Sequence, residues 1–315
     1  MHRPKSMLFG AVAAICYALL PPTGATADPV AGLTPVAVAP GIHALVGPLG
    51  QRDADNLGNN ATFGVIETDA GAVVIDSGGS RRGAEALLKA IHTLTAKPVV
   101  AVINTGGQDH RWLGNGPFHD MGAAIYATEA AIADQKDRAD MQFMVLENLI
   151  GAEGLAGTEA VYADTAVSEE TTLTFGSTTV VLIPAGPAHT PGDMLVWLPQ
   201  SRVVFAGDVV FLDRLLGILP VSSSSGWLEA FGRLEALDPN IVVPGHGSPA
   251  PLAKAQAQTR DYIASVRAAI GTLIEDNGLI QDAPTIDQSA YAALPGFDSL
   301  AGRNAQAVYQ EMEWE

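Results

Sequence analysis

The hydrophobic positions of this chain form short apolar runs, typical of buried strands, separated by segments with helical spacing. In the first half we expect strands at 41–46, 62–67, 71–75, 98–103 and 123–126. Helices are expected at 82–94 and 129–149. The second half repeats this order, with strands at 171–175, 178–183, 194–198, 202–205 and 240–243, and helices at 226–237 and 252–275. The pattern predicts a fold in which strands and helices alternate in both halves.

Three of the remaining segments are expected to be irregular. Residues 28–40 are proline-rich and read as a surface lead-in, and the polar stretch 51–60 reads as a loop near an opening. The glycine-rich stretch 151–157 is expected to be a mobile loop over a site. Residues 281–315 show little periodicity. Because no linker marks a second domain, we expect one domain over 28–280, with 281–315 packing on it as a tail.

The composition excludes two classes of partner. The chain has 315 residues, 48% of them hydrophobic, with 17 basic and 34 acidic side chains and a formal net charge of −17. A chain this acidic has little basic surface to neutralise phosphates, so nucleic acid and anionic membranes are not expected partners. A small-molecule substrate is the expected partner.

The N-terminus has the pattern of a secretory signal peptide over 1–27. Arg3 and Lys5 precede an apolar stretch at 7–20, and Ala25-Thr26-Ala27 is a small-x-small cleavage site. A membrane anchor is the alternative, but about 14 apolar residues are too few to span a bilayer. We therefore expect a periplasmic or secreted protein, with no membrane attachment after cleavage. Loss of Arg3 and Lys5 would move the net charge from −17 to −19.

The single cysteine limits the available chemistry. Cys16 lies inside the apolar stretch of the signal peptide, so the mature chain is expected to have no thiol. Disulfides, a cysteine nucleophile and thiolate metal ligands are thereby excluded. A catalyst built from this chain depends on His, Asp, Glu, Ser or a metal.

Several predicted strands end in loops that carry His or Asp. The candidate metal ligands are Asp109, His110, His189, Asp208 and His246. Imidazole and carboxylate groups without thiolate suit zinc, iron or manganese. The alternative is that the histidines follow strands without sharing a role. Asp76 also follows a strand, and there we expect it to fix neighbouring loops by accepting hydrogen bonds from their amides.

These loops resemble a known family. The segments PAGPAHTPGDMLVWLPQSRVVFAGD, VVPGHG and GAVVIDSGG, with 18 residues between His189 and Asp208 and 37 between Asp208 and His246, are similar to the metallo-β-lactamase superfamily. The resemblance implies an α/β fold, the four-layer αββα sandwich, with a metal site at one edge between two similar halves. The ending GRNAQAVYQEMEWE is also similar to exported members associated with sulfur oxidation and quinoprotein systems.

One motif departs from the family pattern. Members usually carry His-x-His-x-Asp-His after the central strand, whereas this chain has Asn104-Thr105-Gly106-Gly107-Gln108-Asp109-His110, in which the Asp-His is kept and both preceding histidines are absent. The resemblance assigns the two missing histidines and His189 to a first metal site, and Asp109, His110 and His246 to a second, with Asp208 at the second or bridging. It therefore implies one Zn²⁺ per chain, with iron or manganese as alternatives. Gln108 is a further candidate oxygen ligand.

Two functions are consistent with the candidate ligands and with the resemblance. The first is an exported metal-dependent hydrolase that activates water against an ester, lactam or related bond, with Asp109 or His189 as the proton carrier. β-Lactam hydrolysis is a narrower version that the missing histidines disfavour. The second is a catalytically impaired accessory protein that uses the same fold to bind a metal or a ligand. Hydrolysis that disappears in His246→Ala would distinguish them.

Overall fold

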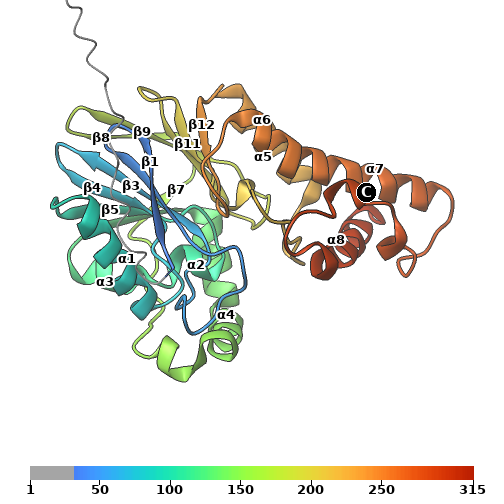
Figure 1. The fold of residues 1–315 in the computed structure, drawn as a ribbon, viewed down its shortest axis with the longest axis horizontal. Coiled ribbons are helices and arrows are strands. Elements are labelled where there is room, and N and C mark those ends of the chain that lie inside the picture. Colours follow the sequence, from blue (N-terminus) through green and yellow to red (C-terminus); the bar gives the residue numbers. More distant parts are fainter. Residues whose placement is uncertain (1–31) are drawn as a thin grey trace, which may run out of the picture.

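The computed structural model describes residues 32–315, and the predicted signal peptide, Cys16 and the cleavage point before Asp28 lie outside them. Two sheets form the centre of the fold (Figure 1). The first has the order β1-β2-β3-β4-β5-β6-β7. Its strands are β1 (Thr34–Ala39), β2 (Ile42–Val46), β3 (Thr62–Thr68), β4 (Gly71–Ile75), β5 (Val99–Ile103), β6 (Ala124–Thr128) and β7 (Thr165–Val167). Strands β1 to β4 pair antiparallel, and β4 to β7 pair parallel.

The second sheet has the order β12-β11-β10-β9-β8. Its strands are β8 (Thr171–Phe175), β9 (Thr178–Pro184), β10 (Met194–Leu198), β11 (Val203–Phe205) and β12 (Ile241–Val243). Neighbours pair antiparallel except β11 and β12, which are parallel. Parallel β11 and β12 deliver their carboxyl ends, and the loops that follow, to the same edge of the sheet.

Most helices lie over the outer faces of the two sheets, and the last ones extend to one side. They are α1 (Arg81–Leu94), α2 (Asp109–Trp112), α3 (Asn115–Asp120), α4 (Glu129–Leu155), α5 (Ser224–Ala236), α6 (Leu252–Ala255), α7 (Asp261–Glu275) and α8 (Phe297–Met312). A π-helical stretch, Gln256–Arg260, joins α6 to α7. Short 3₁₀ helices occur at Gly207–Val209, Ala283–Thr285 and Ser289–Tyr291. No helix within 32–315 is both long and apolar enough to cross a bilayer.

Three buried apolar clusters define four layers. One lies between the sheets and includes Ile75 of β4 and Val196 of β10. A second lies between the first sheet and α1, and a third lies between the second sheet and the helices α5, α7 and α8. All five residues of β4 are buried, as expected for a strand covered on both faces. The predicted αββα sandwich is confirmed.

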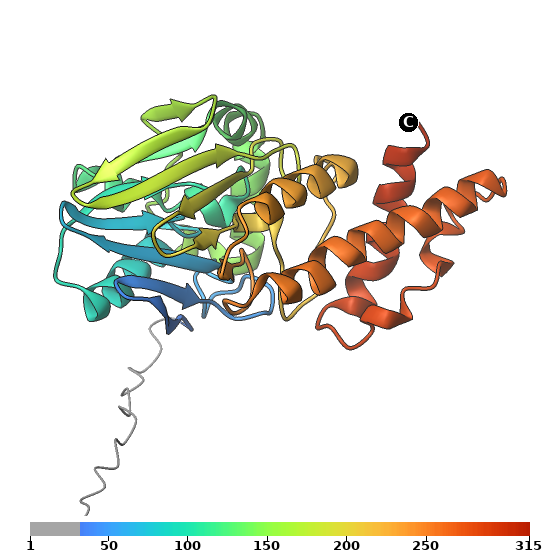
Figure 2. The ribbon, with the colours of Figure 1, turned by 90° about the horizontal axis from the view of Figure 1, so that it is seen from above.

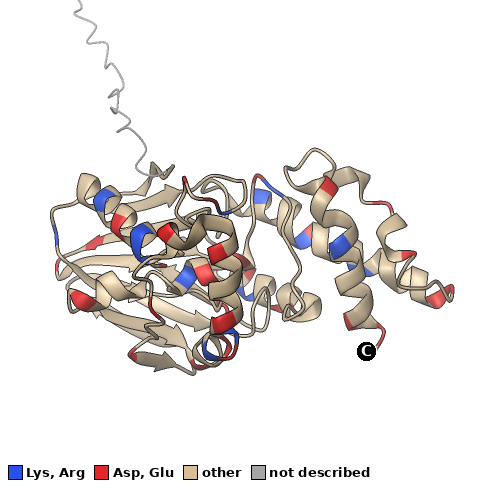
Figure 3. Cartoon of the chain, turned by 90° about the horizontal axis from the view of Figure 1, so that it is seen from below, with Lys and Arg blue, Asp and Glu red and all other residues tan. Residues whose placement is uncertain are grey.

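The last helices extend the fold to one side. In two views, α7 and α8 form a lobe beside the sandwich (Figures 1 and 2). Carboxylates are distributed over many of the elements (Figure 3), in keeping with the acidic composition. Within this lobe the C-terminal tail forms a packed helix, α8, and its buried residues include Ala301, Ala305 and Val308.

Two sequence expectations were wrong, and one helix was not predicted. Residues 34–39 form β1 rather than a lead-in, because Val36 and Val38 pack onto the inter-sheet core, and an edge strand tolerates proline. The expected loop at 151–157 is helical to Leu155, since α4 resumes after a single non-helical residue, Gly151. The tail contains α8, whose apolar stripe is weak in sequence because alanines supply part of it. The other predicted strands and helices begin and end within two residues of their expected bounds, except that α4 ends six residues later, at Leu155, and that 252–275 is divided into α6, the π-helical stretch and α7.

Candidate metal centre

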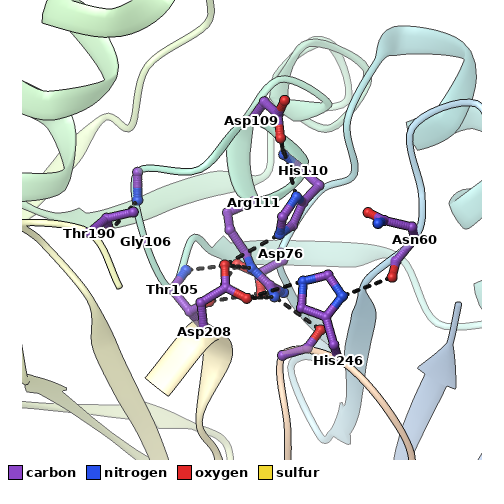
Figure 4. Close-up of polar contacts among 12 residues, drawn as sticks. Asn60, Asp76, Thr105, Gly106, Asp109, His110, Arg111, Thr190, Asp208 and His246 are labelled. Carbon is purple, nitrogen blue, oxygen red and sulfur yellow. Dashed lines mark hydrogen bonds and ion pairs between the residues drawn. The ribbon is translucent and has the colours of Figure 1, made fainter. Parts of the chain in front are cut away.

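Three of the five candidate ligands meet at the edge of the sandwich. His110 lies in α2, just after β5, while Asp208 and His246 follow β11 and β12. The Nε2 atom of His110 is 3.3 Å from Asp208 Oδ2, and that of His246 is 3.3 Å from Asp208 Oδ1 (Figure 4). All three side chains are buried, and each offers a donor atom within 4.8 Å of the others. They come from three segments that are far apart in the sequence.

Hydrogen bonding fixes the orientation of His246. Its Nδ1 atom is 3.0 Å from the carbonyl oxygen of Asn60, which can only accept, so Nδ1 carries the proton. Burial lowers the pKa of His246 to about 3, although Asp208 opposes this shift. The ring is therefore neutral at pH 7, and the lone pair of Nε2 faces the Asp208 carboxylate. Two acceptors facing each other call for a cation between them.

The spacing of these donors fits a small divalent ion. A tetrahedral ion with bonds of about 2.0–2.1 Å to nitrogen and oxygen has neighbouring donors about 3.3 Å apart. The two Nε2–carboxylate distances are both 3.3 Å, each to a different oxygen of Asp208. The backbone carbonyl behind His246 supplies the outer hydrogen bond typical of ligating histidines. The donor set, two imidazoles and one carboxylate, thus fits a divalent metal.

Arg111 holds Asp208 from the side of the protein core. Its Nε and Nη2 atoms donate to Asp208 at 3.0 and 2.6 Å, and its Nη1 donates to Asp76 at 2.8 Å. Burial alone would lower the pKa of Arg111, but Asp208 and Asp76 outweigh it and raise that pKa. Burial opposes ionisation of Asp208 too, yet Arg111 and His110 hold its pKa well below the usual range. Asp208 is consequently an ionised carboxylate.

Asp76 does what its position after β4 predicts. It accepts hydrogen bonds from the Thr105 amide at 2.7 Å and from the Thr105 hydroxyl at 2.9 and 3.0 Å, which fixes the start of the loop after β5. Burial raises the pKa of Asp76, while Arg111 and Thr105 favour its ionised form.

Asp109 lies outside the three-residue cluster. Both of its carboxylate oxygens accept hydrogen bonds from Arg52. Burial would raise the pKa of Asp109, but Arg52 and His110 reverse this and hold it below the ordinary value. Its Oδ1 atom is also 3.2 Å from Nδ1 of His110, whereas the other ring nitrogen, Nε2, faces Asp208. A carboxylate neutralised in this way is a weak proton acceptor.

His189 is also outside the three-residue cluster, but it lines a cavity that His110 and His246 line as well. Its ring centroid lies 5.4 Å from that of Phe211 and 5.2 Å from that of Trp227. Phe211 stacks in turn on His246, with ring centroids 4.7 Å apart. Burial lowers the pKa of His189 to about 4, and its Nδ1 atom has no hydrogen-bond partner in the structure. His189 is therefore a neutral imidazole near the cluster.

The loop that lacks the two family histidines is packed against other polar groups. A Cβ atom on Gly107 would overlap the carboxylate of Asp134, and one on Gly106 would lie 2.6 Å from Oδ1 of Asp193. Asp134 forms a buried ion pair with Arg138 on α4. The Gly107 carbonyl accepts a hydrogen bond from Gln142 at 2.8 Å. Side chains of α4 and of the His189 loop therefore leave no room for side chains at these two glycines.

A cavity of about 240 Å³ opens above the cluster. Three buried side-chain atoms without a hydrogen-bond partner belong to residues that line it: Asn60 Oδ1, Gln108 Oε1 and His189 Nδ1. Buried polar atoms are normally paired, so their gathering here indicates a polar occupant.

Sequence reasoning missed several residues around this cavity. Arg52, Arg214 and Arg303 line it, as do Leu300 and Asn304 of α8. The expectation that 51–60 lies near an opening was the only sequence signal for Arg52. Nothing in the local sequence pattern marks Arg214 or Arg303, since the fold brings them together from distant segments.

Residues 58–246 match the family model described as the metallo-beta-lactamase superfamily. The alpha subunit of a 2,4-dinitroanisole O-demethylase from Nocardioides sp. (strain JS1661) is 26% identical over 183 residues, which span 58% of this chain and 51% of that subunit. A type 2 metallo-beta-lactamase from Bacillus sp. (strain 170) is 25% identical over 187 residues, which span 58% of this chain and 65% of that protein. The matches thus reach only about half to two thirds of the length of these relatives.

The fold is shared with solved structures as well. The stereoselective inverting sec-alkylsulfatase from Pseudomonas sp. superposes with a TM-score of 0.67 at 17% identity, covering 88% of this chain and 50% of that one. At this identity the likeness concerns the fold alone.

Proposed function

The chain belongs to the metallo-β-lactamase superfamily, and from this premise we propose that it is an exported metal-dependent hydrolase with one divalent ion held by His110, Asp208 and His246. Zinc is the proposed metal because two imidazoles and a carboxylate at these spacings suit it, with iron and manganese as alternatives. The proposed substrate is a small molecule with an ester, lactam or related bond. The proposed location, periplasmic or secreted, rests on the N-terminal sequence pattern.

One observation carries this proposal. The unprotonated Nε2 atom of His246 and the ionised Asp208 carboxylate face each other at 3.3 Å, at the floor of a cavity with unpartnered polar atoms. A divalent ion bound there supplies Lewis acidity, which lowers the pKa of water to about 7 and polarises a carbonyl. Neither a protonated histidine nor a neutral carboxylate accounts for the contact at pH 7.

The surrounding residues have distinct tasks in this proposal. Arg111 fixes the orientation of Asp208, and the Asn60 carbonyl fixes that of His246. His189 lines the cavity and its Nδ1 atom is free of hydrogen bonds in the structure, so it is the proposed proton acceptor. Asp109, which Arg52 neutralises, has a positioning role beside His110 instead.

Metal content per chain tests the proposal. The wild type should hold about one zinc, iron or manganese ion, and Asp208→Ala and His246→Ala should each lose it while remaining folded by circular dichroism. Asp238→Ala is the control, because Asp238 is an exposed carboxylate paired only with Arg202. Hydrolysis of esters, thioesters, lactams or lactones should disappear in His246→Ala. A folded wild type with no bound metal would overturn the proposal.

A second function is favoured by Arg111. Because its guanidinium already donates to both oxygens of Asp208, the carboxylate has less charge to offer a metal. A side chain at Gly107, two residues before Asp109, would also overlap the Asp134 carboxylate. These contacts favour an accessory protein that binds a small ligand in the same cavity. Metal-loaded wild type without hydrolysis of any of these substrates would support this alternative.

A further inference from the structure

A second cavity adjoins the one above the metal ligands. It has a volume of about 650 Å³ and shares Arg52, Gln108, Leu219 and Arg303 with the first cavity. The first cavity, of about 240 Å³, is smaller than a typical small-molecule site of roughly 300–1,000 Å³. A substrate of ordinary size that reaches the metal ligands would therefore extend into the second cavity.

The second cavity has an apolar wall. Met141 and Val145 of α4 line it, together with the segment from Leu219 to Val221. Met141 is 48% exposed and Val145 is 38% exposed, so packing within the fold leaves much of their apolar surface uncovered. An apolar wall that continues from a polar cavity suits a ligand with an apolar body.

Two arginines at the junction have no carboxylate partner within residues 32–315. Arg214 donates only to carbonyl oxygens, those of Leu215 and Gly50 at 3.4 and 3.5 Å, and no ion pair joins Arg303 to an acid. Both line the first cavity, and Arg303 also lines the second. In a chain with twice as many acidic as basic side chains, two such arginines in one cavity are unexpected.

The surroundings of Arg214 also favour an anion in the cavity. Burial and the nearby charge of Arg52 lower the pKa of Arg214, although Asp208 opposes the shift. A guanidinium that is partly desolvated without an acid beside it gains from an anion in the cavity.

We propose that the substrate is an amphiphilic anion, with its anionic group bound by Arg214 and Arg303 and its apolar body lying against Met141, Val145 and Leu219. This inference rests on the proposed function, because it names the substrate class of the same site. The two arginines orient the anion, and the α4 wall sets how long an apolar body is accepted. A neutral apolar molecule would contact only the apolar wall, and a short anion would contact only the two arginines.

Calorimetric titration with octane-1-sulfonate tests the proposal on the protein as purified. A sulfonate is a weak ligand for divalent metals, so its binding reports on the arginines and the apolar wall. Octane-1-sulfonate should bind at least tenfold more tightly than methanesulfonate or 1-octanol. Arg214→Gln and Arg303→Gln should each weaken binding about five- to tenfold, consistent with about 1 kcal/mol or more for a charge-assisted hydrogen bond. Equal binding of 1-octanol would overturn the anionic part of the proposal.

Matched variants separate the two halves of the site. Arg233→Gln removes an arginine that donates to a backbone carbonyl away from these cavities, and it should leave binding unchanged. Met141→Asn should weaken octane-1-sulfonate and leave methanesulfonate unchanged, whereas Met144→Asn, on the same helix but outside the cavity lining, should affect neither. If Met141→Asn and Met144→Asn behave alike, the apolar part is wrong.

Binding is measured without turnover, so the two proposals fail separately. Octane-1-sulfonate bound through Arg214 and Arg303 by a protein that hydrolyses nothing would remove the hydrolase and keep the ligand class. Hydrolysis that depends on His246 without arginine-dependent binding would do the reverse.

Discussion

Arg111 donates to both carboxylate oxygens of Asp208, with its Nε at 3.0 Å and its Nη2 at 2.6 Å. The same guanidinium donates to Asp76 at 2.8 Å. Asp76 follows β4 of the first sheet and Asp208 follows β11 of the second, so one buried cation joins the two sheets at the edge that carries the candidate metal centre. The contact that orients this candidate ligand is thus also a contact of the fold.

Replacing Arg111 with methionine should destabilise the protein strongly. The substitution leaves Asp76 and Asp208 buried without their shared cation, and breaking a buried ion pair costs about 3–5 kcal/mol. Arg111→Lys should lose less, since it keeps the charge but not the planar fork. Urea unfolding measures both changes.

Arg82→Met is the control for this comparison. Arg82 forms an exposed ion pair with Glu153, and such pairs contribute about 0–1 kcal/mol. A loss in Arg111→Met no larger than that of Arg82→Met would show that the buried pairs do not stabilise the fold.

Removing a bound metal should lower the melting temperature of the wild type. A ligand present at 100 times its Kd stabilises the native state by about 2.7 kcal/mol. Treatment with a chelator followed by dialysis should therefore reduce Tm, and added zinc should restore it. His246→Ala should show neither change, because it lacks a ligand of the proposed site. A wild-type Tm unaffected by both treatments would contradict a tightly held ion.

Much of the fold could be predicted from sequence because its strands are short and strongly apolar. The runs at β4 and β10 have lengths and flanking turns that leave little choice of structure. β1 was not predicted because Pro35 within it and the prolines that flank it are typical of a loop, and only pairing with β2 makes it a strand. α8 escaped because its buried face includes alanine and asparagine.

The residues of the candidate site also divide into those that the sequence predicts and those that it does not. Residues at strand ends, such as His110 and Asp208, could be named because their position along the chain is itself the signal. Arg52 could not be paired with Asp109, because 57 residues separate them and only the folded loop brings them together. The same holds for Arg303, which reaches the cavity from α8.

The two glycines after β5 should resist substitution. A Cβ on Gly107 would overlap the Asp134 carboxylate, so Gly107→Ala should destabilise by about 1–3 kcal/mol, the usual cost of overpacking. Gly50→Ala is the control, because a Cβ atom there would meet no atom of a non-adjacent residue within 4 Å. The cost should shrink in an Asp134→Ala, Arg138→Met background, as measured by urea unfolding. An unchanged cost in that background would assign the strain to another neighbour.

His189 should make stability depend on pH on the acid side. Burial lowers its pKa to about 4 from an unfolded value near 6.5, so between these values the unfolded chain binds a proton that the native protein does not. The stability contribution of the neutral ring is therefore present above pH 6.5, falls by up to about 1.4 kcal/mol per pH unit as the pH drops, and is lost near pH 4.

His189→Asn should remove this dependence. The difference in unfolding free energy between wild type and variant, measured by urea at each pH from 7 to 4, should change by a few kcal/mol in the direction that favours the variant at low pH. Burial raises the pKa of the neighbouring Asp193 to about 7, so its stabilisation is full below the unfolded value and lost as the pH rises through 7. That contribution has the opposite sign, but both proteins contain Asp193, so it cancels in the difference. His92→Asn, at an exposed position of α1, should show no such trend, and a flat difference for His189→Asn would mean that the native ring is protonated as readily as the unfolded one.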